Sequence, residues 1–481
     1  MITKIISVVL FFLSFCILNA DTYHNINGFF GEKAAGLGGA YTAISDDPSG
    51  AYYNPAGLTF AYDNSVSLSA SNITRTSKSY QNVIGPGQGY LRDSQNYIPN
   101  FFGIVKEVGK YKVGFSIVNT LNETFNRADQ IVNPIYYPSI TSLRSYNIET
   151  YSQVQAGFSL ARAITDKFSV GATLYYTHDT ANFTNTFLAQ DTSKNFSSDT
   201  GVDNRKTVGF YPILGIMYMP NNLVSLGLSV RRQFVTGGNR LVNGFSAAAG
   251  STSEDLVFFE GTHKSSGGSV GDSIFRTGPL NGRIPETSEV RAGIAIFPSK
   301  KFMAAFDTIY TSGYKRNLDQ TEVYLFGEGN NEIVIVSSDV QELRRYATYN
   351  FALGLEYFLT DNFSVRGGAF TNNSNSKNIN WLRTAIEAAN RESSDKETVL
   401  ETDDGKVSYQ LPFLREPERN EYVNLMGYSL GFSWSTSRAS LGLTIVREAG
   451  KGGSQIDSSR PSQQMIYDST AIYVIVSSKN N

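Results

Sequence analysis

Apolar and polar residues alternate with a period of two along many segments of the chain. In residues 65–71 (SVSLSAS), Val66 and Leu68 share one face and serines occupy the other. Residues 167–177 and 224–231 alternate in the same way. Successive side chains of a β-strand point to opposite faces, whereas a helical face repeats about every 3.6 residues. The pattern therefore predicts an all-β protein of about fourteen strands. We place them at residues 64–73, 100–106, 110–120, 146–162, 167–178, 205–219, 222–234, 284–297, 300–312, 343–359, 362–371, 421–435, 438–448 and 464–478.

The connections between these strands alternate between short turns and long polar loops. The short ones are Glu107–Gly109, Thr165–Asp166, Asn221, Pro298–Ser299, Thr360–Asp361 and Thr436–Ser437. Outer-membrane barrels have short periplasmic turns and long extracellular loops. A closed barrel also leaves no backbone polar group unpaired in lipid. We therefore predict a transmembrane antiparallel β-barrel of about 14 strands, and a soluble all-β domain is the less favoured alternative.

The beginning of the chain has the features of an export signal. Lys4 precedes an apolar run at residues 5–18, and the small residue Ala20 follows it. This run is too short to cross a bilayer comfortably. The arrangement predicts a removed signal peptide at residues 1–20. A lipoprotein signal with the lipid on Cys16 is disfavoured by the bulky residue before that cysteine.

Composition narrows the class of protein further. Only 17% of residues are charged and 13% are aromatic, and 41 basic residues face 43 acidic ones, a net charge of −2. Abundant aromatic residues argue against a disordered chain, and the charge balance gives no indication of nucleic-acid binding. Cys16 is the single cysteine, so the exported chain would hold no disulfide and a closed barrel would supply its stability.

The barrel interior is predicted to carry both charged and apolar side chains. Positions that alternate with the lipid-facing ones must point inward, and they include residues of both kinds. The apolar inward positions either pack against a plug or line a site for a hydrophobic ligand, and both roles are compatible with one protein. The inward charges include Arg231, Arg291 and Arg366, and the candidate ligand-lining residues are Ile213, Met217, Met303 and Ile309.

Residues 21–63 precede the first strand and do not alternate. They are rich in glycine and other small residues, which permit close backbone packing. We interpret them as a compact hatch, or plug, inside a barrel that would otherwise be open. The predicted division is therefore a signal peptide at 1–20, a hatch at 21–63 and a barrel at 64–481.

Short motifs in this segment resemble the FadL-type outer-membrane transporters of long-chain fatty acids and other hydrophobic compounds. They are Gly38–Ala43 (GGAYTA), the pair Asp46 and Asp47, and Tyr53–Gly57 (YNPAG). The resemblance implies a fourteen-stranded barrel with an N-terminal hatch that carries the Asn-Pro-Ala motif, in the outer membrane of a diderm bacterium. The chain departs from the usual outer-membrane pattern because its last strand lacks a terminal aromatic residue.

The resemblance also implies a passive transport mechanism. A hydrophobic molecule is captured by extracellular loops, enters a pocket in the barrel, and leaves sideways into outer-membrane lipid after the hatch shifts. Asn54, Pro55 and Ala56, followed by Gly57, match the hatch motif. We expect Asp46 and Asp47 to latch the hatch to the lumen arginines, or alternatively to cap a helix or turn. The expected partners are a fatty acid-like molecule and lipid, with no cofactor, metal or nucleic acid, for a monomeric protein.

One predicted extracellular loop has a helical pattern. Residues 379–392 space Trp381 and Ile386 with other apolar residues at helical intervals. This segment either covers a ligand above the barrel or packs on its rim.

Catalysis is the least favoured function. His24, His178 and His263 are scattered, without metal-ligand spacing or a nucleophile motif. The main alternative to transport is a FadL-like barrel that serves as a structural or assembly partner for surface or secreted proteins.

Overall fold

The computed structural model describes residues 23–97, 99–192, 196–249, 256–260, 263–266, 285–317, 322–326, 332–336, 342–377, 398–402, 405–409, 421–454 and 462–478. The predicted signal peptide at 1–20 and the predicted loop residues Trp381 and Ile386 lie outside these ranges.

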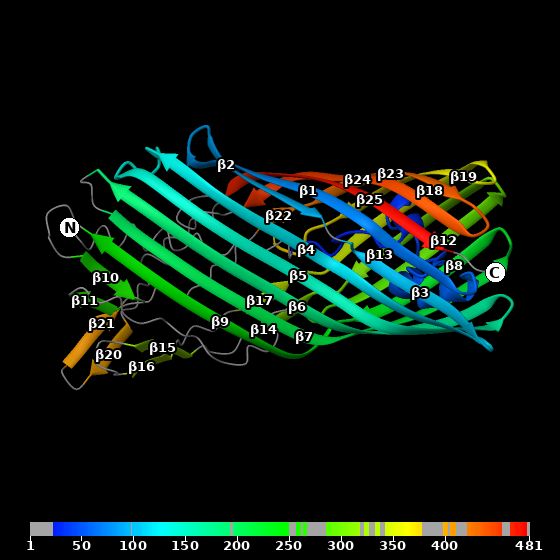
Figure 1. The fold of residues 1–481 in the computed structure, drawn as a ribbon, viewed down its shortest axis with the longest axis horizontal. Helices are drawn as coiled ribbons and strands as arrows, with labels where there is room; N and C mark the ends of the chain where they lie inside the picture. Colours follow the sequence, from blue (N-terminus) through cyan, green and yellow to red (C-terminus); the bar gives the residue numbers. More distant parts are fainter. Residues whose placement is uncertain are drawn as a thin grey trace.

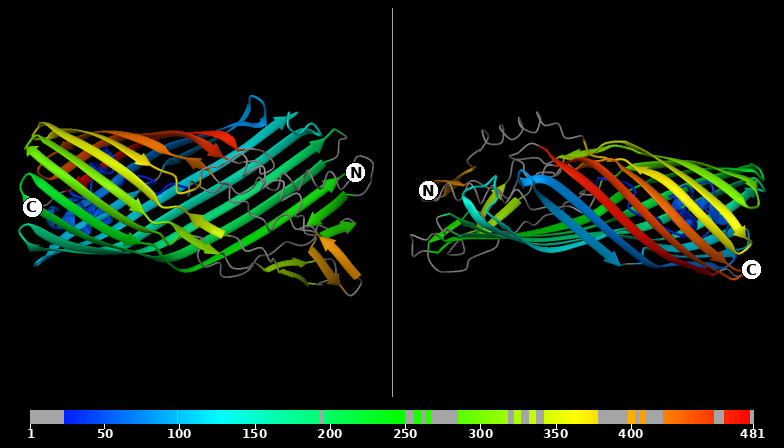
Figure 2. Two further views of the ribbon diagram at one scale, coloured as in Figure 1. Left: turned by 180° about the vertical axis from the view of Figure 1, so that it is seen from behind. Right: turned by 90° about the horizontal axis from the view of Figure 1, so that it is seen from above.

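Fourteen antiparallel strands form a closed barrel, as the sequence predicted (Figures 1 and 2). The ladder between the first and last strands closes the wall and runs from Val66–Ser478 to Tyr80–Met465. The six predicted short connections are confirmed as turns at one end. In order around the wall, the strands are β1 (Ser65–Gly85), β3 (Phe101–Val108), β4 (Tyr111–Val132), β5 (Ile140–Thr165), β6 (Phe168–Asp191), β7 (Phe196–Asn221), β8 (Val224–Arg232), β12 (Ser288–Ser299), β13 (Phe302–Thr311), β18 (Thr348–Thr360), β19 (Phe363–Asn372), β23 (Leu425–Ser435), β24 (Ala439–Ser454) and β25 (Gln463–Ser478).

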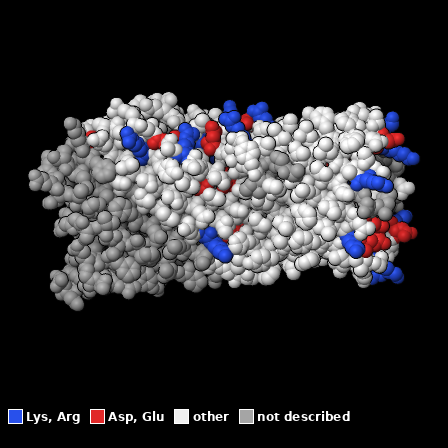
Figure 3. All heavy atoms as spheres, viewed as in Figure 1, with Lys and Arg blue, Asp and Glu red and all other residues white. Residues whose placement is uncertain are grey.

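The outer face of the wall is apolar and the inner face is small or polar. Along β8, Leu226, Leu228 and Val230 are exposed, whereas Ser225 and Ser229 are buried. This is the reverse of a soluble protein and fits a lipid-facing surface. Figure 3 shows charged side chains gathered at the turn end and toward the opposite end, with a nearly uncharged band between them. Among the described residues, no helix is both long and apolar enough to cross a membrane.

The wall is much taller on one side than on the other. β4 to β7 are 22 to 26 residues long, whereas β8 has 9 residues and β13 has 10. A transmembrane strand needs only about 9–11 residues. The long strands therefore extend beyond the membrane at the end of the barrel away from the short turns. We call this end, which is on the left in Figure 1, the upper side.

The predicted strand ends were wrong on this upper side. Residues predicted as loops form the upper part of β1, the strand β2 (Gln88–Tyr97) paired with it, and β9 (Phe234–Ala249), which pairs with the upper part of β7. These stretches have polar residues on both faces because neither face meets lipid, so apolar alternation does not mark them. Shorter strands are β10 (Leu256–Glu260), β11 (His263–Ser266), β14 (Tyr314–Asn317), β15 (Glu322–Phe326), β16 (Glu332–Val336), β17 (Glu342–Arg345), β20 (Thr398–Thr402), β21 (Gly405–Tyr409) and β22 (Tyr422–Val423).

Residues 23–64, which we call the plug, lie inside the barrel near the short turns (Figures 1 and 2). The plug contains α2 (Glu32–Gly36), α3 (Gly50–Tyr53) and the 3-10 helix η2 (Pro55–Phe60). Its Leu37 and Tyr41 belong to one buried cluster with wall residues such as Phe101 and Tyr175. The main core of the protein is therefore the contact between plug and wall.

Candidate functional site

Glycines in the wall let the plug lie directly against the strands. An alanine Cβ at Gly215 would lie 2.0 Å from Asn54 Oδ1, and one at Gly227 would lie 2.2 Å from the carbonyl oxygen of Thr42. Atoms at such distances cannot coexist, so only glycine permits this approach. On other strands, plug atoms lie within 3.0 Å of the Cβ that would be added at Gly103, Gly171, Gly354, Gly368 and Gly442.

Asn54, from the Asn-Pro-Ala motif, fastens the plug both to itself and to the wall. Its side-chain oxygen accepts the N–H of Ala56 (3.2 Å), which caps η2. Its amide nitrogen donates to the carbonyl oxygens of Thr42 in the plug (2.8 Å) and Ile216 in β7 (3.0 Å). One buried asparagine therefore joins three segments of chain.

The rest of the motif shapes this attachment. Pro55 occupies the start of η2, where a missing N–H costs nothing. The hydroxyl of Ser169 in β6 donates to the carbonyl of Ala56 (3.0 Å). A Cβ at Gly57 would lie 2.6 Å from the carbonyl oxygen of Ser45, so glycine is required for the plug to fold back on itself.

The predicted latch between the acidic pair and the lumen arginines is wrong. Asp46 pairs with Lys33 inside the plug and accepts the hydroxyl of Tyr41 (2.9 Å). Asp47 accepts the N–H of Ser49 (2.7 Å), which is the capping alternative. Burial opposes the ionisation of Asp46, but Lys33 and Tyr41 lower the pKa of Asp46 below its ordinary value. The pKa of Asp47 is raised, first by burial and then by the neighbouring charge of Asp46. Neither carboxylate is bonded to an arginine in the part of the chain that the structure describes.

Glu32 makes the latch instead. Arg366 in β19 donates from Nη1 to Glu32 Oε1 (2.8 Å) and from Nε to the wall residue Glu356 (2.7 Å). The hydroxyl of Ser440 completes the site at the second oxygen of Glu32 (3.0 Å). Burial opposes the ionisation of Glu32, but Arg366 and neighbouring hydroxyls lower the pKa of Glu32 below its ordinary value. One buried arginine thus ties plug to wall.

The other two lumen arginines hold the aromatic end of the plug. Arg231 Nη2 donates to the carbonyl of Tyr53 (2.8 Å), and its guanidinium lies 4.8 Å from the ring centre of Tyr52. Arg291 lies 5.5 Å from the ring centre of Tyr53. Both arginines pair with Glu289, at 3.3 and 2.5 Å. This cluster forms the boundary between the plug and the space above it.

Asp307 in β13 is a further attachment that sequence reasoning did not assign. It accepts the backbone N–H groups of Tyr41 (2.9 Å) and Thr42 (2.8 Å) and is fully buried. Its inward strand parity was visible in the sequence, as was the presence of Glu32 in the plug. Their partners lie more than 260 positions away in the chain, so no local pattern could identify the pairs.

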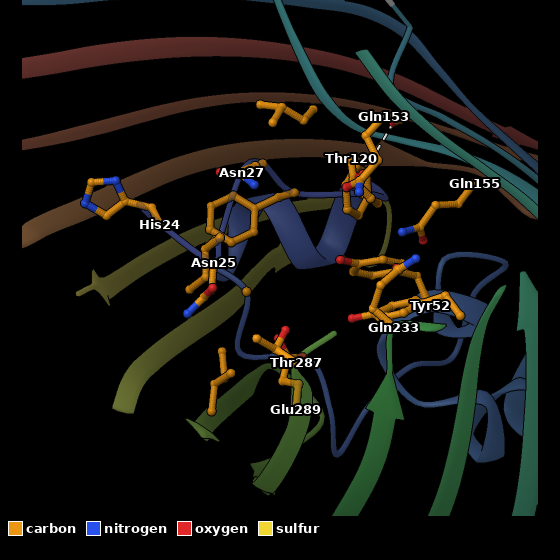
Figure 4. Close-up of a pocket in the computed structure, with 18 of the residues that line it drawn as sticks. His24, Asn25, Asn27, Tyr52, Thr120, Gln153, Gln155, Gln233, Thr287 and Glu289 are labelled. Carbon is orange, nitrogen blue, oxygen red and sulfur yellow. Dashed lines mark hydrogen bonds between the residues drawn. The ribbon is translucent and has the colours of Figure 1, made fainter. Parts of the chain in front are cut away.

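A cavity of about 160 Å³, cavity 1, lies directly above the plug (Figure 4). Aromatic side chains, mostly from the plug, line part of it, and other residues of the plug and the wall line the rest. Arg291, Glu289 and Arg345 contribute charge. The aromatic residues are Phe29, Phe30, Tyr52, Tyr53, Tyr151 and Tyr211, and the carboxamides are Asn25, Asn27, Gln153, Gln155, Gln233 and Asn375. The cavity is thus far more polar than the sequence suggested.

The predicted apolar lining divides between the two roles considered for it. Ile309 lines cavity 1. Ile213 and Met303 instead belong to the buried cluster around the plug, which is the packing alternative. Met217 is buried but lines neither cavity described here. The contacts of the wall with the plug therefore account for two of these four positions.

A second cavity of about 90 Å³, cavity 2, adjoins the first and reaches the wall. His24, Ile26, Asn27 and Leu121 line both cavities. Cavity 2 is otherwise mostly polar, and four of its carboxamides come from β2, from the β2–β3 connection and from β4. These are Asn96, Asn100, Asn119 and Asn122.

The wall beside cavity 2 is interrupted. The ladder of β1 with β2 ends at Ile73–Tyr97, and its ladder with β3 begins at Leu68–Phe102, with Pro99 between them. Among the described residues, no backbone ladder joins β2 to β4. Side chains join them instead, such as Asn96, whose amide donates to the carbonyl of Asn122 (2.7 Å). We call residues 96–100 with 119–122 the wall seam.

Solved structures with the same architecture are outer-membrane channels. The chain is 13% identical to the Pseudomonas putida toluene transporter TodX, with a TM-score of 0.58 over 94% of this chain and 98% of that one. It is 12% identical to the Ralstonia pickettii toluene transporter TbuX, with a TM-score of 0.54 over 95% of this chain and 100% of that one. It is also 12% identical to a Pseudomonas aeruginosa FadL homologue, with a TM-score of 0.54 over 95% of this chain and 99% of that one. At these identities the likeness establishes the fold. No curated protein matches the sequence significantly.

The sequence itself matches a family model over residues 28–381, which is most of the chain. That family is described as outer membrane protein transport protein (OMPP1/FadL/TodX). The match includes most of the plug and most of the residues that line the two cavities. The chain therefore belongs to the OMPP1/FadL/TodX family of outer-membrane transport proteins, whose members carry hydrophobic compounds across the outer membrane.

Proposed function

We propose that the protein takes up hydrophobic small molecules passively and releases them sideways through the wall seam. A molecule captured at the upper, extracellular side enters cavity 1, passes to cavity 2, and leaves between β2 and β4 into the outer membrane. The observation that carries this proposal is the position of cavity 2, which adjoins both cavity 1 and the wall seam. There, side-chain hydrogen bonds and the backbone bond from the N–H of Asn119 to the carbonyl of Asn100 (2.8 Å) take the place of a continuous ladder.

The plug favours a sideways path over a vertical one. Its backbone or side-chain atoms rest against wall glycines on seven strands, and buried charges fasten it. Residues 23–30 are the exception, because they run along the lumen and line both cavities. Asn100 in the seam donates to the carbonyl of Phe29 (2.8 Å). We therefore assign hatch movement to residues 23–30, whose shift would join the two cavities while α2, α3 and η2 stay seated.

The volume of cavity 1 bears on the size of the cargo. A cavity of roughly 150 Å³ is large enough for benzene, so a single ring fits cavity 1 at about 160 Å³ without rearrangement. A long-chain fatty acid would need cavity 2 and the loop region as well. Both classes remain within the proposal, and the solved neighbours described as toluene transporters make aromatic compounds a natural first probe.

A scaffold for surface or secreted proteins is the second candidate, favoured by the tall side of the wall. β5 has 26 residues, which at about 3.3 Å each extend far beyond the roughly 25 Å apolar band of an outer-membrane barrel. Such a wall offers a large surface outside the membrane. Transport does not require that much height.

Equilibrium binding of labelled oleate to the folded protein in mild detergent, with competition by toluene, tests transport first. We expect saturable binding, above that of protein-free micelles, that toluene displaces. Absence of saturable binding in folded protein would reject the transport proposal and favour the scaffold, for which a pull-down of surface proteins is the next experiment.

A further inference from the structure

Carboxamide side chains outnumber alkyl side chains in the lining of both cavities. From this we infer that the preferred cargo is a small ring compound that carries a hydrogen-bond donor, such as a phenol, rather than a plain hydrocarbon. The inference rests on the proposed function and defines the substrate class of the same site. It depends on the chemistry of the lining and on two buried acceptors that have no partner.

Cavity 1 has two chemically different sides. The plug contributes four of the six aromatic rings, among them Tyr52, and the rest of the chain contributes four of the six amides (Figure 4). Figure 4 shows Gln153 and Gln155 descending from β5 toward Tyr52, with Gln233 beside it. Aromatic rings favour a flat apolar ring, whereas amides favour a polar substituent. A phenol satisfies both sides at once.

Gln155 supplies the first unmatched acceptor. Its side chain is 3% exposed, and Oε1 has no hydrogen-bond partner in the described structure. The neighbouring amides are occupied, because Gln153 accepts from Thr120 (2.5 Å) and Gln233 donates to Thr177 (3.1 Å). A buried polar atom without a partner is costly. A donor on the cargo would remove that cost at Gln155.

Asn100 supplies the second, in cavity 2 at the wall seam. It is 5% exposed; its amide nitrogen is bonded to Phe29, while Oδ1 has no partner among the described residues. Both unmatched atoms are therefore acceptors, and they lie at successive positions along the proposed path. A hydrocarbon would leave both acceptors unpaired, whereas a hydroxyl group would supply a donor for them.

Phenol and toluene provide a matched pair of probes, because they have the same shape and differ by a hydroxyl in place of a methyl group. Equilibrium dialysis of each labelled compound, corrected with protein-free micelles, would be measured for the wild type and for Gln155→Leu. We expect the ratio of the toluene Kd to the phenol Kd to fall at least about fivefold in Gln155→Leu. Comparing ratios removes the difference in hydrophobicity between the two compounds.

Gln130→Leu is the control, since Gln130 is exposed on β4 and should leave the ratio unchanged. Gln155→Met is measured in parallel, with the circular dichroism spectrum and unfolding temperature of each variant, so that a folding defect is not mistaken for lost recognition. An unchanged ratio in both Gln155 variants, with toluene still bound, would overturn the inference and leave the proposed function intact. Binding of neither compound would reject both.

Discussion

The lower and upper halves of the lumen use the same inward strand positions in opposite ways. In the lower half, glycine and serine occupy them, and the plug backbone lies against the strands. In the upper half, glutamine, asparagine and tyrosine occupy them, and two cavities remain. Strand parity therefore determines only which residues face inward. Their size decides whether a stretch of wall closes the barrel or leaves space for cargo.

Removing the buried arginine of the lower half should have the largest effect. Arg366→Met leaves two buried carboxylates, Glu32 and Glu356, without their cation. Losing one partner of a buried ion pair costs about 3–5 kcal/mol. We expect a decrease of that size in the free energy of unfolding, measured by urea titration in detergent.

The exposed pair of Arg447 and Asp468, at 2.6 Å, is the matched control. Arg447→Met should change the unfolding midpoint very little, because exposed pairs are screened by solvent. Addition of Glu32→Gln to Arg366→Met should recover part of the loss. Equal destabilisation by the two arginine variants would show that Arg366 does not latch the plug.

Two adjacent glycines on β19 test how closely the plug packs against the wall, and the expected loss of stability is the next largest. A Cβ at Gly368 would lie 2.4 Å from the backbone nitrogen of Gly38, whereas a Cβ at Gly367 would meet no atom within 4 Å. Overpacking typically costs about 1–3 kcal/mol. Gly368→Ala should therefore lower the unfolding temperature and make cells more sensitive to large hydrophilic antibiotics, while Gly367→Ala should do neither. The same response to both variants would argue against a closely seated plug.

Loss of the Asn54 amide should have a smaller and more local effect. Asn54→Ala removes the cap of η2 and two hydrogen bonds, to Thr42 and Ile216. Loss of a helix cap typically costs about 0.5–2 kcal/mol. Hydrogen exchange should accelerate at residues 55–60 and remain slow in the upper strands. Asn126→Ala, at an exposed position of β4, should change neither region.

Strand alternation and turn spacing predicted the closed barrel, because they report which face meets lipid. The same signal fails above the membrane, where the upper part of β1 and all of β2 were interpreted as loop. The sequence pattern also could not identify which plug residue pairs with which wall residue. The sequence pointed to an acid–arginine latch, but Asp46 is satisfied by Lys33 within the plug and Glu32 takes the arginine.

The cavities were the least predictable feature. Their lining combines residues from the plug, β4, β5 and β12, and no one segment shows a motif for it. Ile213 and Met303 had the right parity for a ligand site, but the plug covers them. Which inward residues remain uncovered depends on the height of the plug, and a strand pattern carries no information about that height.

Crosslinking the wall seam tests the sideways exit most directly. Asn96→Cys with Asn122→Cys places a thiol pair across β2 and β4, and Ser77→Cys with Asp93→Cys places one across the intact β1–β2 ladder. Each single-cysteine variant, capped with a small methylthio group, controls for added bulk in cavity 2. We predict that oxidation of the seam pair lowers toluene uptake into cells at least about tenfold and that reduction restores the uptake. Oxidation of the ladder pair should have no effect on uptake. Toluene should still bind the protein with the oxidised seam pair, because cavity 1 is untouched. Full uptake through a crosslinked seam would contradict exit between β2 and β4.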